Sequence, residues 1–320
     1  MTATATPPLT VSSRNLGYVL AAVGAALFST KAIFIKLAYQ EQVSATLMLA
    51  WRMIFALPFF AGVGAWALMQ KRRRGEAAPT ARDVGLTMGC GALGYYVASY
   101  FDFAGLQYIS AQLERLLLFT YPIMIMFLSA ALFGERITRT QLIAAAITYA
   151  GLGLAFLSAV PAGGRETIAG TLFVLGAALA FAVHQIFAKR FIASLGAMLY
   201  TAISMSAAAL CCIVHHALVS GANFAATPRF LWMAAGCALF ATVLPALAIN
   251  ASLARITPAG VAMISTLSPI VTIALAVVIL SEPFTLADAI GAALVIAGVA
   301  LYTRGDTRKT TVPEASEITP

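Results

Sequence analysis

Ten long apolar runs, separated by short polar segments, follow one another along the chain. Each run is close to the roughly 20 residues that an α-helix needs to cross the hydrocarbon core of a bilayer. The pattern therefore predicts ten membrane-spanning helices, at 16–38, 44–68, 84–105, 111–132, 138–159, 168–190, 196–218, 229–250, 258–280 and 286–303. The polar ends of the chain, 1–15 and 304–320, are rich in Thr, Pro, Ser and charge and are predicted to be disordered tails.

The chain contains an internal repeat. A shift of 147 positions, called the repeat offset below, aligns residues 84–155 with residues 231–302 without a gap. The match includes special residues as well as apolar ones, since Pro122 falls on Pro269 and Glu135 on Glu282. Such a register indicates a duplication. The first helix of each half aligns more weakly, at an offset of 153, which places Lys31 on His184.

Two repeats of five helices, 16–159 and 168–303, follow from this alignment. Because five is odd, the second repeat must enter the membrane from the opposite side. The predicted fold is therefore an all-α integral membrane protein built from two inverted five-helix repeats. Inverted repeats are typical of secondary transporters.

Composition and charge agree with a membrane protein. Apolar residues make up 61% of the chain and charged residues 10%, against about 25% charged in soluble domains. Basic residues near span ends are retained on the cytoplasmic side. A cytoplasmic N-terminus leaves only Arg165 and Arg229 in outer loops and places the other flanking basic residues inside: Arg14, Lys71, Arg72, Arg73, Arg74, Arg82, Arg136, Arg139, Lys189, Arg190, Arg255, Arg304, Arg308 and Lys309. Both termini are predicted to be cytoplasmic, in the cell (inner) membrane.

The net charge of +8 suits this topology and contact with anionic lipid headgroups, so no nucleic-acid partner is expected. No phosphate-binding loop, zinc-binding helix or nucleophile elbow is present. All four cysteines fall within spans, where packing is their expected role. The sequence thus predicts no enzyme activity, no cofactor and no metal. A membrane-embedded enzyme would need clustered histidines or acids at one surface, which three histidines and dispersed acids do not provide.

Several motifs resemble a known family. They are residues 105–111, Tyr121 with Pro122, residues 134–138 and residues 149–151, and the second copy repeats much of this pattern. Together, residues 16–303 resemble the drug/metabolite transporter superfamily, specifically permeases with two tandem EamA-type repeats. The family includes exporters of amino acids and other metabolites, so the resemblance implies export.

Charged residues inside predicted spans are the main candidates for a site. A charge there costs at least about 2.5–3.5 kcal/mol on insertion scales and usually faces a partner or a water-filled cavity. The candidates are Lys31, Arg52, Glu114 and Arg115, with His184 as a further titratable group. One interpretation is a structural ion pair, Arg52 or Lys31 with Glu114.

The other interpretation is a substrate cavity with surplus positive charge, in which three basic groups face Glu114 and Asp102 at the outer end of the third span. Such a cavity would favour a carboxylate or a zwitterion over a pure cation. Adjacent residues on a helix point about 100° apart, so Glu114 and Arg115 are expected to have different partners.

Uncharged residues could line the same path: Tyr95, Tyr96, Gln185 and Asn250. A tyrosine in a helix bundle is nevertheless more often satisfied by a neighbouring helix. Pro122 and Pro269 are candidate hinges, because proline kinks a helix, although a static kink is an equal alternative.

Two further pairs have structural explanations. Glu135 and Glu282 lie beside the predicted helix caps Thr138 and Thr285, where a solvated role at a helix end is expected. Gly85 and Gly89 have the spacing of a close helix contact.

The function predicted from the sequence is a secondary transporter for small metabolites such as amino acids or organic acids. It would work by alternating access through a cavity between the repeats, as a monomer or a homodimer. Protonation of Glu114 or His184 could couple transport to the proton gradient, and facilitated diffusion is the alternative. A lipid scramblase and a non-transporting membrane sensor remain alternative functions.

Overall fold

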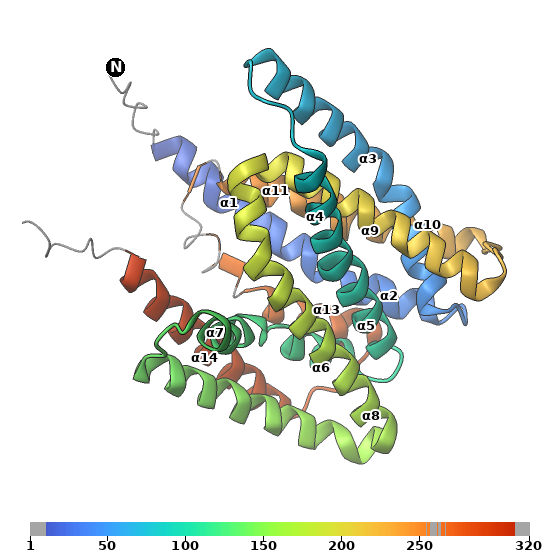
Figure 1. The fold of residues 1–320 in the computed structure, drawn as a ribbon. Helices are drawn as coiled ribbons and strands as arrows, with labels where there is room; N and C mark the ends of the chain where they lie inside the picture. The colour runs from blue at the N-terminus through green and yellow to red at the C-terminus, as the bar shows by residue number, and fades with distance from the viewer. Residues whose placement is uncertain (1–10, 254, 257–260, 262–263, 266, 311–320) are drawn as a thin grey trace, which may run out of the picture.

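The computed structural model describes residues 11–310, except 254, 257–260, 262–263 and 266 (Figure 1). These described residues are almost entirely helical. The helices are α1 (Val11–Ser29), α2 (Lys31–Tyr39), α3 (Ala45–Arg73), α4 (Ala81–Gly91), α5 (Ala98–Gly105), α6 (Ala111–Leu118), α7 (Tyr121–Phe133), α8 (Arg139–Leu195), α9 (Ala197–Ser220), α10 (Pro228–Ala238), α11 (Leu244–Leu253), α13 (Ser268–Leu280) and α14 (Leu286–Thr310). Two π-helical segments, η1 (Ala92–Val97) and η2 (Leu239–Val243), connect α4 to α5 and α10 to α11.

The long element α8 consists of two arms that meet at Gly164, whose φ of 53° and ψ of −126° are not helical. Without a Cβ atom, glycine adopts this conformation at little cost. The sharp turn is clear in Figure 1, where the first arm of α8 runs beside α14 and the second arm turns toward α4. One helix-like element thus contains two predicted spans.

Seven helices of the described chain are long and apolar enough to cross a membrane. They are Asn15–Tyr39, Ala45–Arg73, Ala111–Phe133, Arg139–Ala159, Gly164–Leu195, Ala197–Ser220 and Pro228–Ile249. Two shorter apolar helices, Ser268–Leu280 and Leu286–Tyr302, follow them. The third predicted span is helical from Ala81 to Gly105 but is not among the seven, and its glycines and tyrosines reduce its apolar character. The protein is therefore an all-helical integral membrane protein.

Helix boundaries recur at the repeat offset found in the sequence. The elements α4 and α10 begin at residues 81 and 228, η1 and η2 at 92 and 239, α7 and α13 at 121 and 268, and α8 and α14 at 139 and 286. The same offset separates the two members of each pair. The two copies therefore share their local winding, including an uncommon π-helical segment, as well as their sequence.

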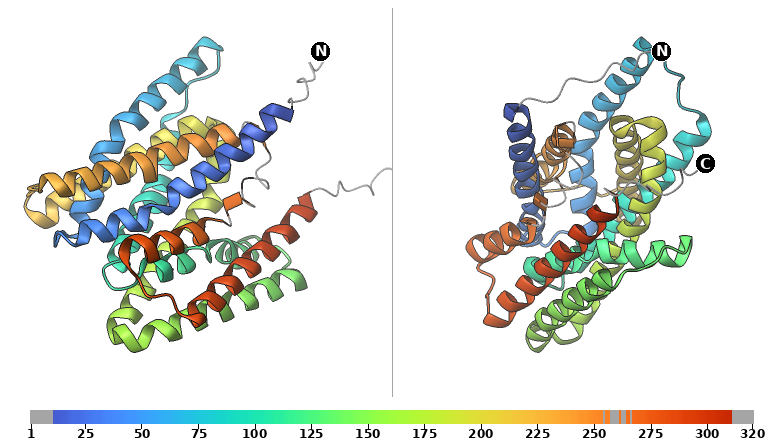
Figure 2. Two further views of the ribbon diagram at one scale, coloured as in Figure 1. Left: turned by 180° about the vertical axis from the view of Figure 1, so that it is seen from behind. Right: turned by 90° about the vertical axis from the view of Figure 1, so that its left-hand side faces the viewer.

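Helices of one copy pack against helices of the other (Figures 1 and 2). The pairs are α1 with α11, α3 with α9, α5 with the second arm of α8, and α14 with the first arm of α8. Glycine permits the last contact, because a Cβ atom on Gly151 would lie 2.6 Å from the carbonyl oxygen of Gly291. The expected close contact at Gly85 and Gly89 is wrong, since no atom of another described helix lies within 4 Å of a Cβ built on either residue.

The two largest apolar clusters of the interior lie one around α2, α3, α5, α9 and α10 and one around α6, α8, α13 and α14. Many large apolar side chains also lie on the outside. Leu218, Trp232 and Val278, on three different helices, are each 79% exposed. Extensive apolar exposure is unfavourable in water and suits a surface that faces lipid.

Candidate functional site

Two of the membrane helices, Asn15–Tyr39 and Ala111–Phe133, each contain a short turn at which the α-helical hydrogen-bond pattern is interrupted, called a helix break below. The first break, at Thr30, separates α1 from α2, and the second, at Phe119 and Thr120, separates α6 from α7. In both breaks a threonine hydroxyl donates to the carbonyl three residues earlier: Thr30 Oγ1 to Leu27 O at 2.6 Å, and Thr120 Oγ1 to Leu117 O at 2.7 Å. Interrupted membrane helices commonly provide the polar groups of a binding site.

A charge cluster lies beside these breaks. Lys31 is the first residue of α2, and its Nζ donates to Asp102 Oδ2 at 2.6 Å and lies 3.1 Å from Glu114 Oε1. Asp102 belongs to α5 and Glu114 to α6, so the cluster joins three predicted spans. The Lys31–Glu114 pair considered from the sequence is present. Asp102, which the sequence places at the outer end of its span, also belongs to this cluster, because it accepts a hydrogen bond from Lys31.

Arg115 extends this cluster toward α13. Its guanidinium group donates to Ser268 Oγ and lies 5.3 Å from the centre of the Phe28 ring. Ser29 Oγ is 2.6 Å from the same serine oxygen, which connects the end of α1 with the start of α13. As expected, the neighbouring side chains of Glu114 and Arg115 have different partners.

The formal charges of the cluster cancel, but some of its polar atoms lack hydrogen-bond partners within the described chain. Lys31 and Arg115 are matched by Asp102 and Glu114, and Glu114 is completely buried. Within the described part of the chain, neither oxygen of Glu114 accepts a hydrogen bond. Buried carboxylates are normally hydrogen-bonded, and those that are not are candidates for binding protons or ligands.

Arg52 lies apart from these acids. Its Nε donates to Thr242 Oγ1 at 3.0 Å, and its guanidinium carbon lies 5.2 Å from the centre of the Phe103 ring. Its Nη1 is buried and has no hydrogen-bond partner among the described residues. The Arg52–Glu114 pair considered from the sequence is therefore not formed, and Arg52, like Arg115, has no acid of the described chain in direct contact.

His184 lies in a separate cluster on the second arm of α8. Its Nδ1 is 2.9 Å from the carbonyl oxygen of Cys90, and its ring centre is 4.7 Å from that of Tyr95. Gly94 makes room for this ring, because a Cβ atom there would overlap with it. His184 is 0% exposed and thus acts as a packed polar residue between helices.

The two π-helical segments organise these polar groups. Cys90 and Cys237 are register mates, separated by the repeat offset, and each lies just before a π segment. The carbonyl of Cys90 contacts His184, and that of Cys237 accepts a hydrogen bond from Thr242 Oγ1 at 3.2 Å. A change to π winding alters the backbone hydrogen-bond pattern and is frequent at functional sites.

Of the remaining predicted residues, those whose side chains the structure describes do not join either cluster. Tyr96 packs against His215, with ring centres 5.7 Å apart, and Gln185 is half-buried on the second arm of α8. The side chain of Asn250 lies outside the described residues. Pro122 and Pro269 are the second residues of α7 and α13, so a helix begins at each proline instead of continuing through a kink. Proline is favourable in a first helical turn, and their role as hinges stays a prediction.

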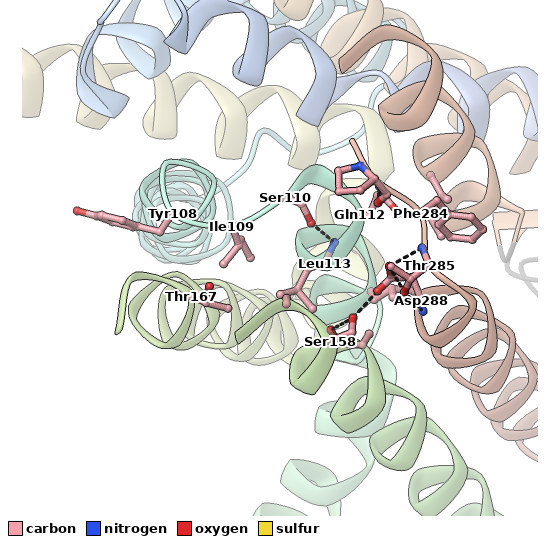
Figure 3. A pocket seen from close by; sticks show the side chains of 15 residues that line it. Tyr108, Ile109, Ser110, Gln112, Leu113, Ser158, Thr167, Phe284, Thr285 and Asp288 are labelled. Carbon is pink, nitrogen blue, oxygen red and sulfur yellow. Dashed lines mark hydrogen bonds between the residues drawn. The ribbon is translucent and has the colours of Figure 1, made fainter. Parts of the chain in front are cut away.

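A pocket of about 280 Å³ lies at the ends of several helices (Figure 3). Ser110 and Gln112 of the α6 start, Ser158 and Thr167 of the two α8 arms, and Asp288 of α14 line it. None of the residues predicted to bind substrate lines this pocket. Of its features, the sequence predicted only the helix cap formed by Thr285 and Asp288, which the structure confirms. The pocket itself was not predicted, because the loops that enclose it meet only in the folded protein.

The other sequence interpretations have mixed outcomes. The cap of α8 is confirmed as a reciprocal pair between Thr138 and Gln141. Glu135 is exposed, as expected, whereas Glu282 bonds to the start of α6. Among the described residues, no group of three or more His, Cys, Asp or Glu side chains could hold a metal ion.

Comparisons with known proteins agree on one family. The profile of the EamA-like transporter family matches residues 15–157 and again residues 168–304. The chain is also similar to the "Uncharacterized transporter YcbK" of Bacillus subtilis (strain 168), with 26% identity over 283 residues that cover 86% of this chain and 88% of that protein. A protein of known crystal structure is similar in fold, with a TM-score of 0.61 and 20% identity over 95% of this chain and all of the other. The chain therefore belongs to the EamA-like transporter family.

Proposed function

We propose that this protein is a secondary transporter that exports small metabolites, such as amino acids or organic acids, by alternating access. The observation that carries the proposal is the charge cluster of Lys31, Asp102, Glu114 and Arg115 beside two helix breaks. Charged groups within membrane spans mark substrate or ion pathways, and interrupted helices commonly form the binding sites of transporters. Membership of a transporter family supports the same function.

The proposed architecture has ten spans arranged as two inverted repeats in the inner membrane, with both termini in the cytoplasm. It is supported by the helix boundaries that recur at the repeat offset and by the pairing of first-copy with second-copy helices. Alternating access would then consist of the two copies exchanging equivalent arrangements around the cluster.

Arg52 is the proposed contact for the substrate. It is 6% exposed, its Nη1 has no partner in the described chain, and no acid there pairs with it. A buried, unpaired guanidinium group is costly, and a substrate carboxylate would supply the missing bidentate partner. This arrangement favours amino acids and organic acids over organic cations.

A binding screen tests the substrate class. Purified protein is heated with L-amino acids, small organic acids or quaternary ammonium compounds, because a ligand that binds the folded state raises the unfolding temperature. We expect shifts with the first two classes only. Arg52→Met should abolish them, while Arg82→Met, which changes an exposed arginine, should retain them. Shifts with cations alone, or equal shifts in both variants, would contradict the proposal.

Glu114 is the proposed group for proton coupling. A completely buried carboxylate that accepts no well-formed hydrogen bond within the described chain is costly in its charged form, so a proton and the nearby Lys31 ammonium can compete for it. His184, the other candidate from the sequence, is engaged with the Cys90 carbonyl. In proteoliposomes, a pH gradient should drive uptake by the wild type, and Glu114→Gln should remove this dependence. Uptake that ignores the gradient would leave facilitated diffusion as the mechanism.

A further inference from the structure

The start of α6 is held by a residue of the other copy. At the N-terminus of a helix the first backbone N–H groups lack helical partners. In α6, Leu113 N donates to Ser110 Oγ at 3.2 Å, whereas Ala111 N and Gln112 N donate to Glu282 Oε1 and Oε2 at 2.8 and 3.3 Å. The Glu282 carboxylate therefore accepts hydrogen bonds from the first two of the eight residues of α6. Its negative charge also suits the positive end of the helix dipole.

The same loop makes a second contact with α6. Gln112 Nε2 donates to the carbonyl oxygen of Pro283 at 3.2 Å. Glu282 and Pro283 belong to the short connection between α13 and α14, which begins at Ser281 with a φ of 53°. A non-glycine residue with this φ is uncommon and fixes the direction of the chain. The connection is thereby aimed at the first turn of α6.

This contact determines where the charge cluster lies. Glu114 and Arg115 follow within the first turn and a half of α6, and they bind Lys31 and Ser268. The apolar side chains of α6 pack against α8 and α13, and because α6 has only eight residues, the contacts at its start also help to set its position. A carboxylate that fixes its N-terminus also fixes the two charged side chains of the cluster.

The first copy has an equivalent glutamate, which differs from Glu282 in exposure and in contacts. Glu135 is the register mate of Glu282 at the repeat offset, follows Gly134 in the left-handed conformation, and is exposed. No hydrogen bond or ion pair of Glu135 is found within the described chain, and residues 258–260, the register mates of 111–113, lie outside it. The two glutamates therefore differ in environment although they share one position in the repeat.

We propose that Glu282 is a latch that closes the face of the transporter carrying the α13–α14 connection and positions Glu114 and Arg115 through α6. The latch is a positioning residue and makes no contact with the substrate. It rests on the proposed alternating access, because a latch requires a second state. When the transporter opens at this face, the carboxylate of Glu282 must leave the N–H groups of Ala111 and Gln112.

Cysteine labelling tests the latch without any substrate. In a variant with the four native cysteines replaced, Ser29→Cys reports on the buried space beside Ser268. A membrane-impermeant thiol reagent is applied to vesicles of either orientation. We expect Glu282→Ala to raise labelling from the α13–α14 face about tenfold, because hydrogen bonds to a charged group that exist in only one state bias the population by that order. Labelling from the opposite face should fall.

Two further variants make the outcome decisive. Glu282→Gln retains one acceptor oxygen and should give a smaller rise than Glu282→Ala, while Glu135→Ala, at the exposed register mate, should give no rise from that face. Unchanged labelling in Glu282→Ala would overturn the latch, and so would increased labelling from both faces, which indicates a loosened fold. A one-sided shift in a protein without transport would support the latch and contradict the proposed function.

Discussion

Lys31 and Glu114 form an ion pair of 3.1 Å between α2 and α6, although Glu114 is completely buried and Lys31 also binds Asp102. One ammonium group thus serves two carboxylates on two different helices. The arrangement is energetically favourable only while all three groups stay together, because each acid would otherwise be a charge without its partner in an apolar interior.

Lys31→Met should therefore destabilise the protein strongly, by about 3–5 kcal/mol, the usual cost of leaving a buried charge without its partner. Glu114→Gln should cost less, because Asp102 still neutralises Lys31. Thermal unfolding of the detergent-purified variants measures both. The double variant Lys31→Met/Glu114→Gln should recover part of the lost stability, and a double variant no more stable than Lys31→Met would show that Glu114 does not depend on Lys31.

Gly94→Ala should lower stability by about 1–3 kcal/mol, the range for overpacking a filled interior. The added Cβ atom would overlap with the His184 ring. The matched control is Gly85→Ala on the same predicted span, where nothing lies within 4 Å, and it should be neutral or slightly stabilising. Adding His184→Ala to Gly94→Ala should remove the overlap, so the two changes should be less than additive in thermal unfolding.

Thr242→Val should lower stability by about 1–3 kcal/mol, because it leaves buried polar groups unsatisfied. Thr242 Oγ1 accepts from Arg52 Nε and donates to the Cys237 carbonyl, and valine retains the shape of threonine without the hydroxyl. Thr242→Ser keeps the hydroxyl and is the control. Equal unfolding temperatures for the Val and Ser variants would mean that the hydroxyl contributes nothing at this site.

Ala77→Cys and Ala225→Cys test the inverted arrangement directly. Both residues are exposed in connections, the first between α3 and α4 and the second between α9 and α10. In a cysteine-replaced background, an impermeant reagent added to intact cells should label Ala225→Cys, and labelling of Ala77→Cys should require permeabilised cells. If both sites react from the same side, the repeats are not inverted.

More of the fold than of the site could be predicted from the sequence. Hydrophobic run length and the register between the two copies are local or periodic signals, so they predicted most of the helices and the starts of α8 and α14 to within one residue. They did not predict that α7 and α13 begin next to Pro122 and Pro269, which lay in the middle of predicted spans. The ion pair of Lys31 with Glu114 could be considered because charged residues are rare in spans. The choice between Lys31 and Arg52 could not be made, since helix pairing decides it.

Tertiary contacts account for the other misses. Glu282 has the sequence context of a solvated helix end, and only the folded chain brings it to Ala111. Gly85 and Gly89 have the spacing of a packing motif but point into open space, whereas Gly94 packs closely without a recognisable pattern. The π-helical winding at η1 has no simple sequence signal either. Each of these features depends on which helices become neighbours.

The two π-helical segments also indicate the order of two events in the evolution of the chain, an insertion and a duplication. A π segment arises when one extra residue is accommodated within a helix. An insertion into only one copy would change the spacing between the copies from that point on. The spacing is nevertheless the same before the segments, at 81 and 228, and after them, at 121 and 268. On the proposed duplication, the extra residue was therefore already present in the ancestral repeat before it was doubled.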